Sequence, residues 1–140
     1  MEDWIGVPFR AHGRVRQEGL DCWGLICAVY WERWTLELPS YDTEYHRPED
    51  AETVGELAAL ESRCWNPVEE PRLGDVALLR VQGHFAHVGL VVARGLMLHT
   101  MTGIDSALER YNGPAWGRRL VGFYRHPALW GGQPTPEPLL

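Results

Sequence analysis

The sequence predicts an α+β fold in which N-terminal helices pack on a five-stranded antiparallel sheet. In the first half, apolar residues are dense over 22–34 and recur on roughly one helical face over 48–64. In the second half, short segments rich in β-branched and aromatic residues alternate with Gly, Asn and Pro. Helices that precede such strands favour packing of the helices on the sheet. A chain of 140 residues suits one domain with a substantial core.

The N-terminal half begins with an expected long ordered loop over 6–21, which has turn residues and charge but little periodicity. A buried helix is expected from Cys22 to about Trp34, with Asp21 as the residue that caps its first turn. A loop over 38–48 and a short amphipathic helix over 48–64 are expected to follow.

The C-terminal half is expected to form an antiparallel meander. Arg94 and Gly95 fit a hairpin turn between its second and third strands. We assign residues 1–128 to one domain and 129–140 to a Pro- and Gly-rich tail. The five expected strands cover 74–81, 87–93, 96–100, 106–111 and 120–126.

Charge and composition restrict the function classes. The net charge of -6 argues against a nucleic-acid partner, because phosphate binding needs a basic surface. No apolar stretch approaches the roughly 20 residues that span a bilayer, so no membrane anchor is expected. The acidic N-terminus lacks the layout of a signal peptide, which predicts synthesis in the cytoplasm. Three cysteines at unrelated spacings predict no disulfide framework.

Cys22 is the candidate nucleophile among the three cysteines. A helix N-terminus favours the thiolate, and Cys22 directly follows the expected cap. Cys27 lies farther into the helix and is interpreted as core, while Cys64 has no comparable surroundings. A helix-start cysteine is by itself weak evidence for catalysis, and core filling is its alternative.

The six histidines offer a catalytic base for Cys22. His87 starts one expected strand and His99 lies on the next, so a hairpin would bring them close, and one could orient the other. A half-buried structural role is the alternative for each. A zinc site formed by His84, His87, His99 and Cys22 is a weaker alternative, because positions 84 and 87 of one strand point to opposite faces.

Several motifs in order resemble the NlpC/p60 family of cysteine peptidases. They are "GVPFRAHGR", "EGLDCWGLI" and "PRLGDVALLRVQGHFAHVGLVVARGLMLHT", and the resemblance covers about residues 5 to 126. It implies a papain-like fold with the cysteine helix packed on the sheet. It also implies Cys22 as the nucleophile, His87 as the base and His99 as the orienting third residue. No cofactor or metal is expected.

Two positions depart from the family pattern. Trp23 stands where the family has a Ser that grips the free amino end of the substrate, and Phe9 stands where it has a Tyr beside the nucleophile. With Asp21, these are the candidate substrate-binding residues. Core packing is the alternative for Trp23, and helix capping is the alternative for Asp21. The substrate implied by the resemblance is the γ-D-glutamyl to diamino-acid bond of peptidoglycan stem peptides.

In its residues, this set of motifs is most similar to the family branch encoded in the tail modules of phages and gene transfer agents. The segments "DCWGLICAVYWERWTLELPSY", "LMLHT" and "GFYRHP" carry this resemblance. It implies a protein of the virion tail, with other tail proteins as partners, that acts on the periplasmic cell wall. Two alternatives are a structural tail component with little catalysis and an enzyme that transfers acyl groups of lipids.

Overall fold

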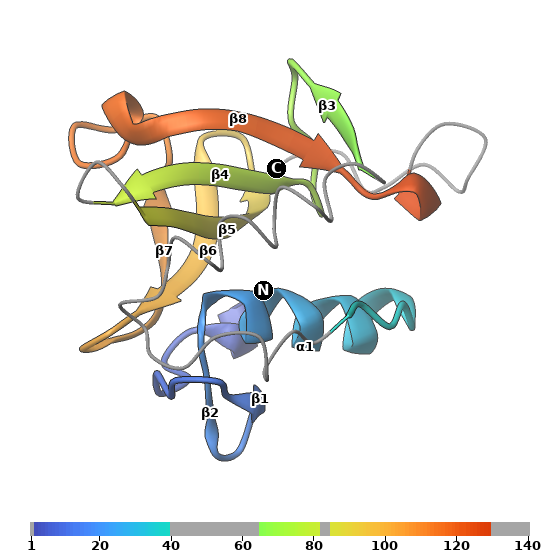
Figure 1. The fold of residues 1–140 in the computed structure, drawn as a ribbon, viewed down its shortest axis with the longest axis vertical. Helices are drawn as coiled ribbons and strands as arrows, with labels where there is room; N and C mark the ends of the chain where they lie inside the picture. Colours follow the sequence, from blue (N-terminus) through green and yellow to red (C-terminus); the bar gives the residue numbers. More distant parts are fainter. Residues whose placement is uncertain (1, 40–64, 82–84, 130–140) are drawn as a thin grey trace.

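The computed structural model describes residues 2–39, 65–81 and 85–129, and its main feature is a six-stranded antiparallel sheet (Figure 1). The strand order is β3-β8-β4-β5-β6-β7, and a separate two-stranded sheet pairs β1 with β2. The strands are β1 (Arg14–Val15), β2 (Gly19–Leu20), β3 (Asn66–Val68), β4 (Val76–Val81), β5 (Phe85–Ala93), β6 (Leu96–Met101), β7 (Ile104–Arg110) and β8 (Leu120–Arg125).

The α+β class and the five expected strands are confirmed, but the strand number and the helices need correction. β3 is a sixth strand at the edge of the sheet, and β1 and β2 lie in the segment expected to be a loop. β3 has three residues and contains Pro67, which lacks an N–H and is tolerated at a sheet edge. So short a segment carries no alternation that predicts a strand. One α-helix lies within the described ranges, while the expected helix over 48–64 falls outside them.

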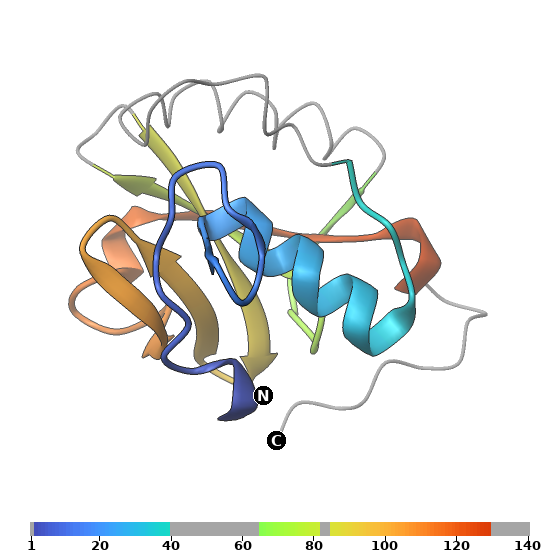
Figure 2. The same ribbon diagram turned by 90° about the horizontal axis from the view of Figure 1, so that it is seen from below.

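The helix α1 spans Cys22–Trp34, as the sequence predicts. The Asp21 side chain caps it by accepting a hydrogen bond from the Gly24 amide. It ends at Thr35, whose φ of 53° lies in the left-handed region. Figures 1 and 2 show α1 lying across one face of the sheet, with β1 and β2 on its far side. The described helices include none long and apolar enough to cross a membrane.

The sheet buries apolar side chains on both faces, and β5 shows the division. Val88, Leu90 and Val92 join the core that α1 covers, while Val91 points to a second cluster on the other face. The second cluster contains Met97, Tyr111 and Trp116 among its buried members. Because both faces are covered, β5 reads as a nearly continuous apolar run.

The hairpin between β5 and β6 confirms the expected turn and determines where the candidate histidines lie. Gly95 adopts a φ of 82° in the turn. Strand pairing runs from Ala93 and Leu96 to Leu90 and Leu98 and does not continue past the latter pair. β6 also pairs with β7 from Leu96 to Met101, and Figure 1 shows these two strands crossing β4 and β5 at a steep angle. The strands therefore diverge just before they reach His87 and His99.

The C-terminal part of the described chain continues the core. Leu129, the first residue of the expected tail, is buried in a short 3-10 helix over Pro127–Leu129 and packs in the cluster under α1. Residues 130–140 lie outside the described ranges.

A buried ion pair joins the start of β4 to the end of β8. The Arg125 guanidinium donates from Nε and Nη2 to the two carboxylate oxygens of Asp75, each at 2.8 Å. Asp75 also accepts from the Arg72 amide at 2.7 Å. This planar two-point contact satisfies a carboxylate that water does not reach.

Replacing Arg125 by Leu is expected to lower the free energy of unfolding by about 3–5 kcal/mol, because the Asp75 charge would stay buried without its partner. Urea denaturation measures the change. Arg94→Leu removes an exposed arginine and should change stability by less than about 0.5 kcal/mol. Equal effects of the two variants would contradict the importance of the pair.

Candidate active site

Cys22 is placed by the Asp21 carboxylate at the start of α1. Asp21 is buried and accepts hydrogen bonds from the Gly24 amide, the His12 amide and Arg14 Nη1 at 2.8, 3.2 and 2.7 Å. These donors come from the helix and from the loop before it. The candidate substrate residue Asp21 is thus a helix cap that ties the two segments together.

Gly24 allows the preceding loop to reach the helix start. A Cβ atom at position 24 would lie 2.0 Å from the Gly13 carbonyl oxygen, so a larger residue cannot be accommodated without moving the loop. Gly13 is equally restricted, since its Cβ would lie 2.2 Å from the Gly19 carbonyl oxygen. The spacing of Asp21, Cys22 and Gly24 therefore has a packing cause.

The half-buried Cys22 thiol meets the sheet at β5. The Val88 and Trp23 backbone amides donate hydrogen bonds to the sulfur and lower its pKa, as does the Arg14 charge. Burial and the Asp21 carboxylate outweigh them and raise the pKa of Cys22 to about 12. The expectation of a lowered pKa at this helix start is therefore not met, although the Trp23 amide of the first turn acts in that direction. The thiol is protonated at neutral pH.

The two candidate histidines form a buried hydrogen-bonded pair. His87 on β5 and His99 on β6 join through His87 Nε2 and His99 Nδ1, which lie 2.8 Å apart. Since Val88 contacts the thiol, His87 is the adjacent residue on the strand that carries that contact. His87 Nδ1, by contrast, takes part in no hydrogen bond within the described residues. The structure therefore brings the Cys22, His87 and His99 segments together.

Sequence reasoning missed a carboxylate and an indole that complete this network. Glu109 Oε1 lies 2.7 Å from His99 Nε2, and Trp116 Nε1 donates to Glu109 Oε2 at 3.1 Å. His99 pairs with Ala107 across β6 and β7, so Glu109 is its diagonal neighbour on the same face. Glu109 is identified by this register, which the structure gives. Trp116 also stacks on the His87 ring, with 5.4 Å between centroids.

Burial keeps both imidazoles neutral. Desolvation, and then the neighbouring His99, lower the pKa of His87 to about 3. Desolvation also lowers the pKa of His99, although Glu109 opposes this through its hydrogen bond and its charge. A neutral imidazole has one nitrogen that donates and one that accepts. One histidine of the pair therefore donates the hydrogen bond between them and the other accepts it.

The other candidate residues have different places. Trp23 is buried in the core beneath the sheet, where its Nε1 donates to the Pro39 carbonyl at 2.7 Å and its ring packs on Trp65. Trp23 thus packs in the core, as the alternative interpretation of this residue expects. Half-buried Phe9 forms a backbone bridge to Leu20. Cys27 packs at the edge of the core. His46, Cys64 and His84 lie outside the described residues.

A metal site is not formed by the described residues. Within them, no group of three or more His, Cys, Asp or Glu side chains is arranged to hold an ion. The weaker zinc alternative included His84, which falls outside these ranges.

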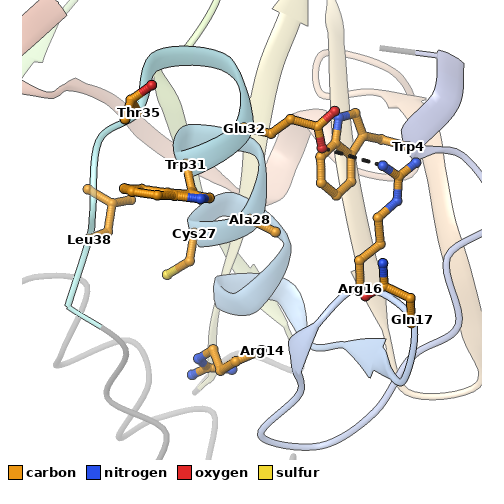
Figure 3. A pocket seen from close by; sticks show the side chains of 10 residues that line it. All are labelled: Trp4, Arg14, Arg16, Gln17, Cys27, Ala28, Trp31, Glu32, Thr35 and Leu38. Carbon is orange, nitrogen blue, oxygen red and sulfur yellow. Dashed lines mark hydrogen bonds and ion pairs between the residues drawn. The ribbon is translucent and has the colours of Figure 1, made fainter.

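A cavity of about 590 Å³ lies on another side of α1 (Figure 3). It separates the helix from the N-terminal segment, and Cys22 is not among its lining residues. Arg16 spans it to Glu32, with 3.4 Å between the charged groups, and places its guanidinium over the Trp4 ring. The residues that line it are Trp4, Arg14, Arg16, Gln17, Cys27, Ala28, Trp31, Glu32, Thr35 and Leu38.

Comparison with known proteins identifies the class of this domain. The profile of the NlpC/P60 family matches residues 6–125, and the chain therefore belongs to that family.

Individual relatives agree with this assignment. The murein DD-endopeptidase/murein LD-carboxypeptidase MepS of Escherichia coli K12 is 27% identical over 117 residues, which are 84% of this chain and 54% of MepS. The chain thus spans about half the length of that relative.

Solved structures share the fold. An NlpC/P60 family protein from Bacillus cereus has a TM-score of 0.65 at 19% identity, covering 89% of this chain and 37% of that one. The NlpC/p60 domain of the peptidoglycan hydrolase SagA has a TM-score of 0.57 at 18% identity, covering 89% and 90%.

The buried neutral His87 predicts a pH-dependent stability. Unfolding restores its pKa from about 3 to the ordinary 6.5, so between these values the unfolded chain binds a proton that the folded chain does not. The contribution of neutral His87 to the free energy of unfolding is complete above pH 6.5. It is lost as the pH falls below that value, by up to about 1.4 kcal/mol per pH unit. Urea denaturation at pH 7 and pH 4.5 should show the loss, and His87→Gln should show a smaller one. An equal loss in that variant would contradict the assignment.

Proposed function

We propose that this protein is a cell-wall peptidase that cleaves amide bonds of peptidoglycan stem peptides with Cys22, His87 and His99. One observation carries the proposal: a thiol at a helix start contacts the strand of a buried, hydrogen-bonded histidine pair. Family membership supports it, as do relatives named as a murein endopeptidase and a peptidoglycan hydrolase.

The reaction proceeds through a thioester. His87 Nδ1 takes the Cys22 proton while the sulfur attacks the amide carbonyl carbon. The first-turn amides of α1 have no acceptor within the helix, and the Cys22 amide among them stabilises the oxyanion. His87 returns the proton to the leaving amine as the carbon–nitrogen bond breaks. Water, deprotonated by the same nitrogen, then hydrolyses the thioester and restores the thiol.

The thiol and imidazole work as a neutral pair. The pKa of Cys22 is raised to about 12 and that of His87 is lowered to about 3, so an ion pair is unfavourable in the resting site. Proton transfer accompanies attack on the carbonyl, where charge moves onto an oxygen that backbone amides can bind.

The bond we propose is the γ-D-glutamyl to diamino-acid amide. The position of Trp23 in the core removes one family contact to the free amino end of that substrate, so recognition falls to other groups around Cys22. Mass analysis of the released peptides distinguishes this bond from others in the stem peptide.

Cys22→Ala is expected to abolish the release of peptides from purified peptidoglycan, because no other group can form the thioester. Chromatography and mass spectrometry of the soluble products measure the release. Cys27→Ala is the matched control: it removes a half-buried thiol from the same helix and should retain cleavage. Circular dichroism checks that both variants fold. Full activity of Cys22→Ala would contradict the proposal.

We further propose that the protein works in the tail of a phage or gene transfer agent, together with other tail proteins, and acts on the periplasmic cell wall. The similarity of "DCWGLICAVYWERWTLELPSY" and "GFYRHP" to that branch supports this placement. The alternative is a structural tail component with little catalysis, which the loss of the family Ser and Tyr at Trp23 and Phe9 favours.

Particles that carry Cys22→Ala separate these two roles. If the protein opens the wall, the particles should assemble normally and deliver genomes poorly, because only the chemistry is lost. Electron microscopy counts the particles and gene transfer measures delivery. Normal delivery by the variant particles would support the structural role instead.

A further inference from the structure

The network beyond His99 has an unexplained charged end. Glu109 has both oxygens engaged, one by His99 Nε2 and the other by Trp116 Nε1. The proposed catalytic steps use neither the Glu109 carboxylate nor the Trp116 indole. Trp116 is 5% exposed and holds three members of the network together: it bonds to the carboxylate, stacks on His87 and meets His99 edge-on. The Arg119 guanidinium lies over the Trp116 ring, 5.5 Å from the ring centroid.

The hydrogen bonds of this network have one consistent direction. An ionised carboxylate only accepts hydrogen bonds, so His99 Nε2 carries a proton and donates the hydrogen bond to Glu109. The Nδ1 of a neutral His99 then accepts, and His87 Nε2 must be the donor to it. A neutral His87 with its proton on Nε2 has a lone pair on Nδ1. That nitrogen is the one able to take the thiol proton.

We propose that Glu109 is a positioning residue that fixes the tautomers of His99 and His87, so that His87 presents an unprotonated Nδ1 to Cys22, and that Trp116 orients the carboxylate. The catalytic importance of this arrangement rests on the proposed peptidase function. The tautomers themselves do not, and this separates the two ideas experimentally.

Glu109→Gln tests the proposal because the indole dictates how the amide can sit. Trp116 Nε1 only donates, so it pairs with the carbonyl oxygen of the glutamine and leaves the amide NH₂ facing His99. His99 Nε2 must then accept, its proton moves to Nδ1, and His87 Nε2 becomes an acceptor. His87 would carry its proton on Nδ1 and could no longer act as the base.

The tautomers are measured by long-range proton–nitrogen spectra of the histidine rings in ¹⁵N-labelled protein at pH 7. The wild-type protein should have protonated Nε2 on both rings, and Glu109→Gln should have protonated Nδ1 on both. The kcat for peptidoglycan cleavage should fall by about 10²- to 10⁴-fold with little change in KM. Asp105→Asn, which removes an exposed charge from the same strand, should alter neither result.

A second substitution provides a rescue. Trp116→Phe keeps an aromatic ring against His87 but removes the indole N–H, so a glutamine at position 109 can turn its carbonyl oxygen to His99. The double variant Glu109→Gln, Trp116→Phe should regain at least about tenfold in kcat over Glu109→Gln and recover the wild-type tautomers. A purely structural role for Glu109 predicts the opposite, since a second change in the cluster would damage the site further.

Two results would overturn the proposal. One is a wild-type His87 with its proton on Nδ1, which needs no variant to observe. The other is a Glu109→Gln protein that keeps the wild-type tautomers. If the wild-type protein has the expected tautomers but cleaves no peptidoglycan, the peptidase function fails while the role of Glu109 in fixing the tautomers stands.

Discussion

The buried Asp21 carboxylate is the constraint on which the site depends. Its hydrogen bonds with the Gly24 amide, the His12 amide and Arg14 join the start of α1 to the loop before it. This arrangement holds Cys22 where the helix meets β5. The same carboxylate has a chemical cost, because its charge and the burial around it raise the pKa of the thiol. Burial, and after it the Asp21 charge, outweigh the backbone amides that lower this pKa. In the proposed mechanism, a neighbouring base therefore removes the thiol proton during attack.

The divergence of β5 and β6 creates room for that base. Where the backbone pairing stops at Leu90 and Leu98, side-chain hydrogen bonds continue the connection between the strands through His87 and His99. Buried imidazoles need partners for their nitrogens, and the diagonal position of Glu109 on β7 supplies one. The network therefore replaces strand pairing at the point where the sheet must open to the helix. The burial of His87 in this network is why acid is expected to lower the stability of the fold.

Family membership and local departures give a consistent picture. The family match over residues 6–125 includes the loop, the helix start and the histidine hairpin, and also Phe9 and Trp23, the two positions at which the sequence resemblance implies other residues. In the structure Trp23 belongs to the core, bonded to Pro39 and packed on Trp65. Under the proposed function, hydrophobic packing at position 23 takes the place of the polar substrate contact that the family resemblance implies.

The sequence by itself determined the bounds of α1, its cap at Asp21 and the five longer strands, and it supplied Cys22, His87 and His99 as the candidate catalytic residues. These features depend on neighbours along the chain: apolar spacing, a capping side chain, a glycine turn and short motifs. Only the tertiary structure decided the sixth strand, the raised pKa of Cys22 and the network of Glu109 and Trp116. Edge pairing of a three-residue strand, burial of a thiol beside a carboxylate, and a diagonal contact across two strands all depend on register and on what covers each group. A register shift of one residue would turn Glu109 to the opposite face, and no local pattern in the sequence specifies that register.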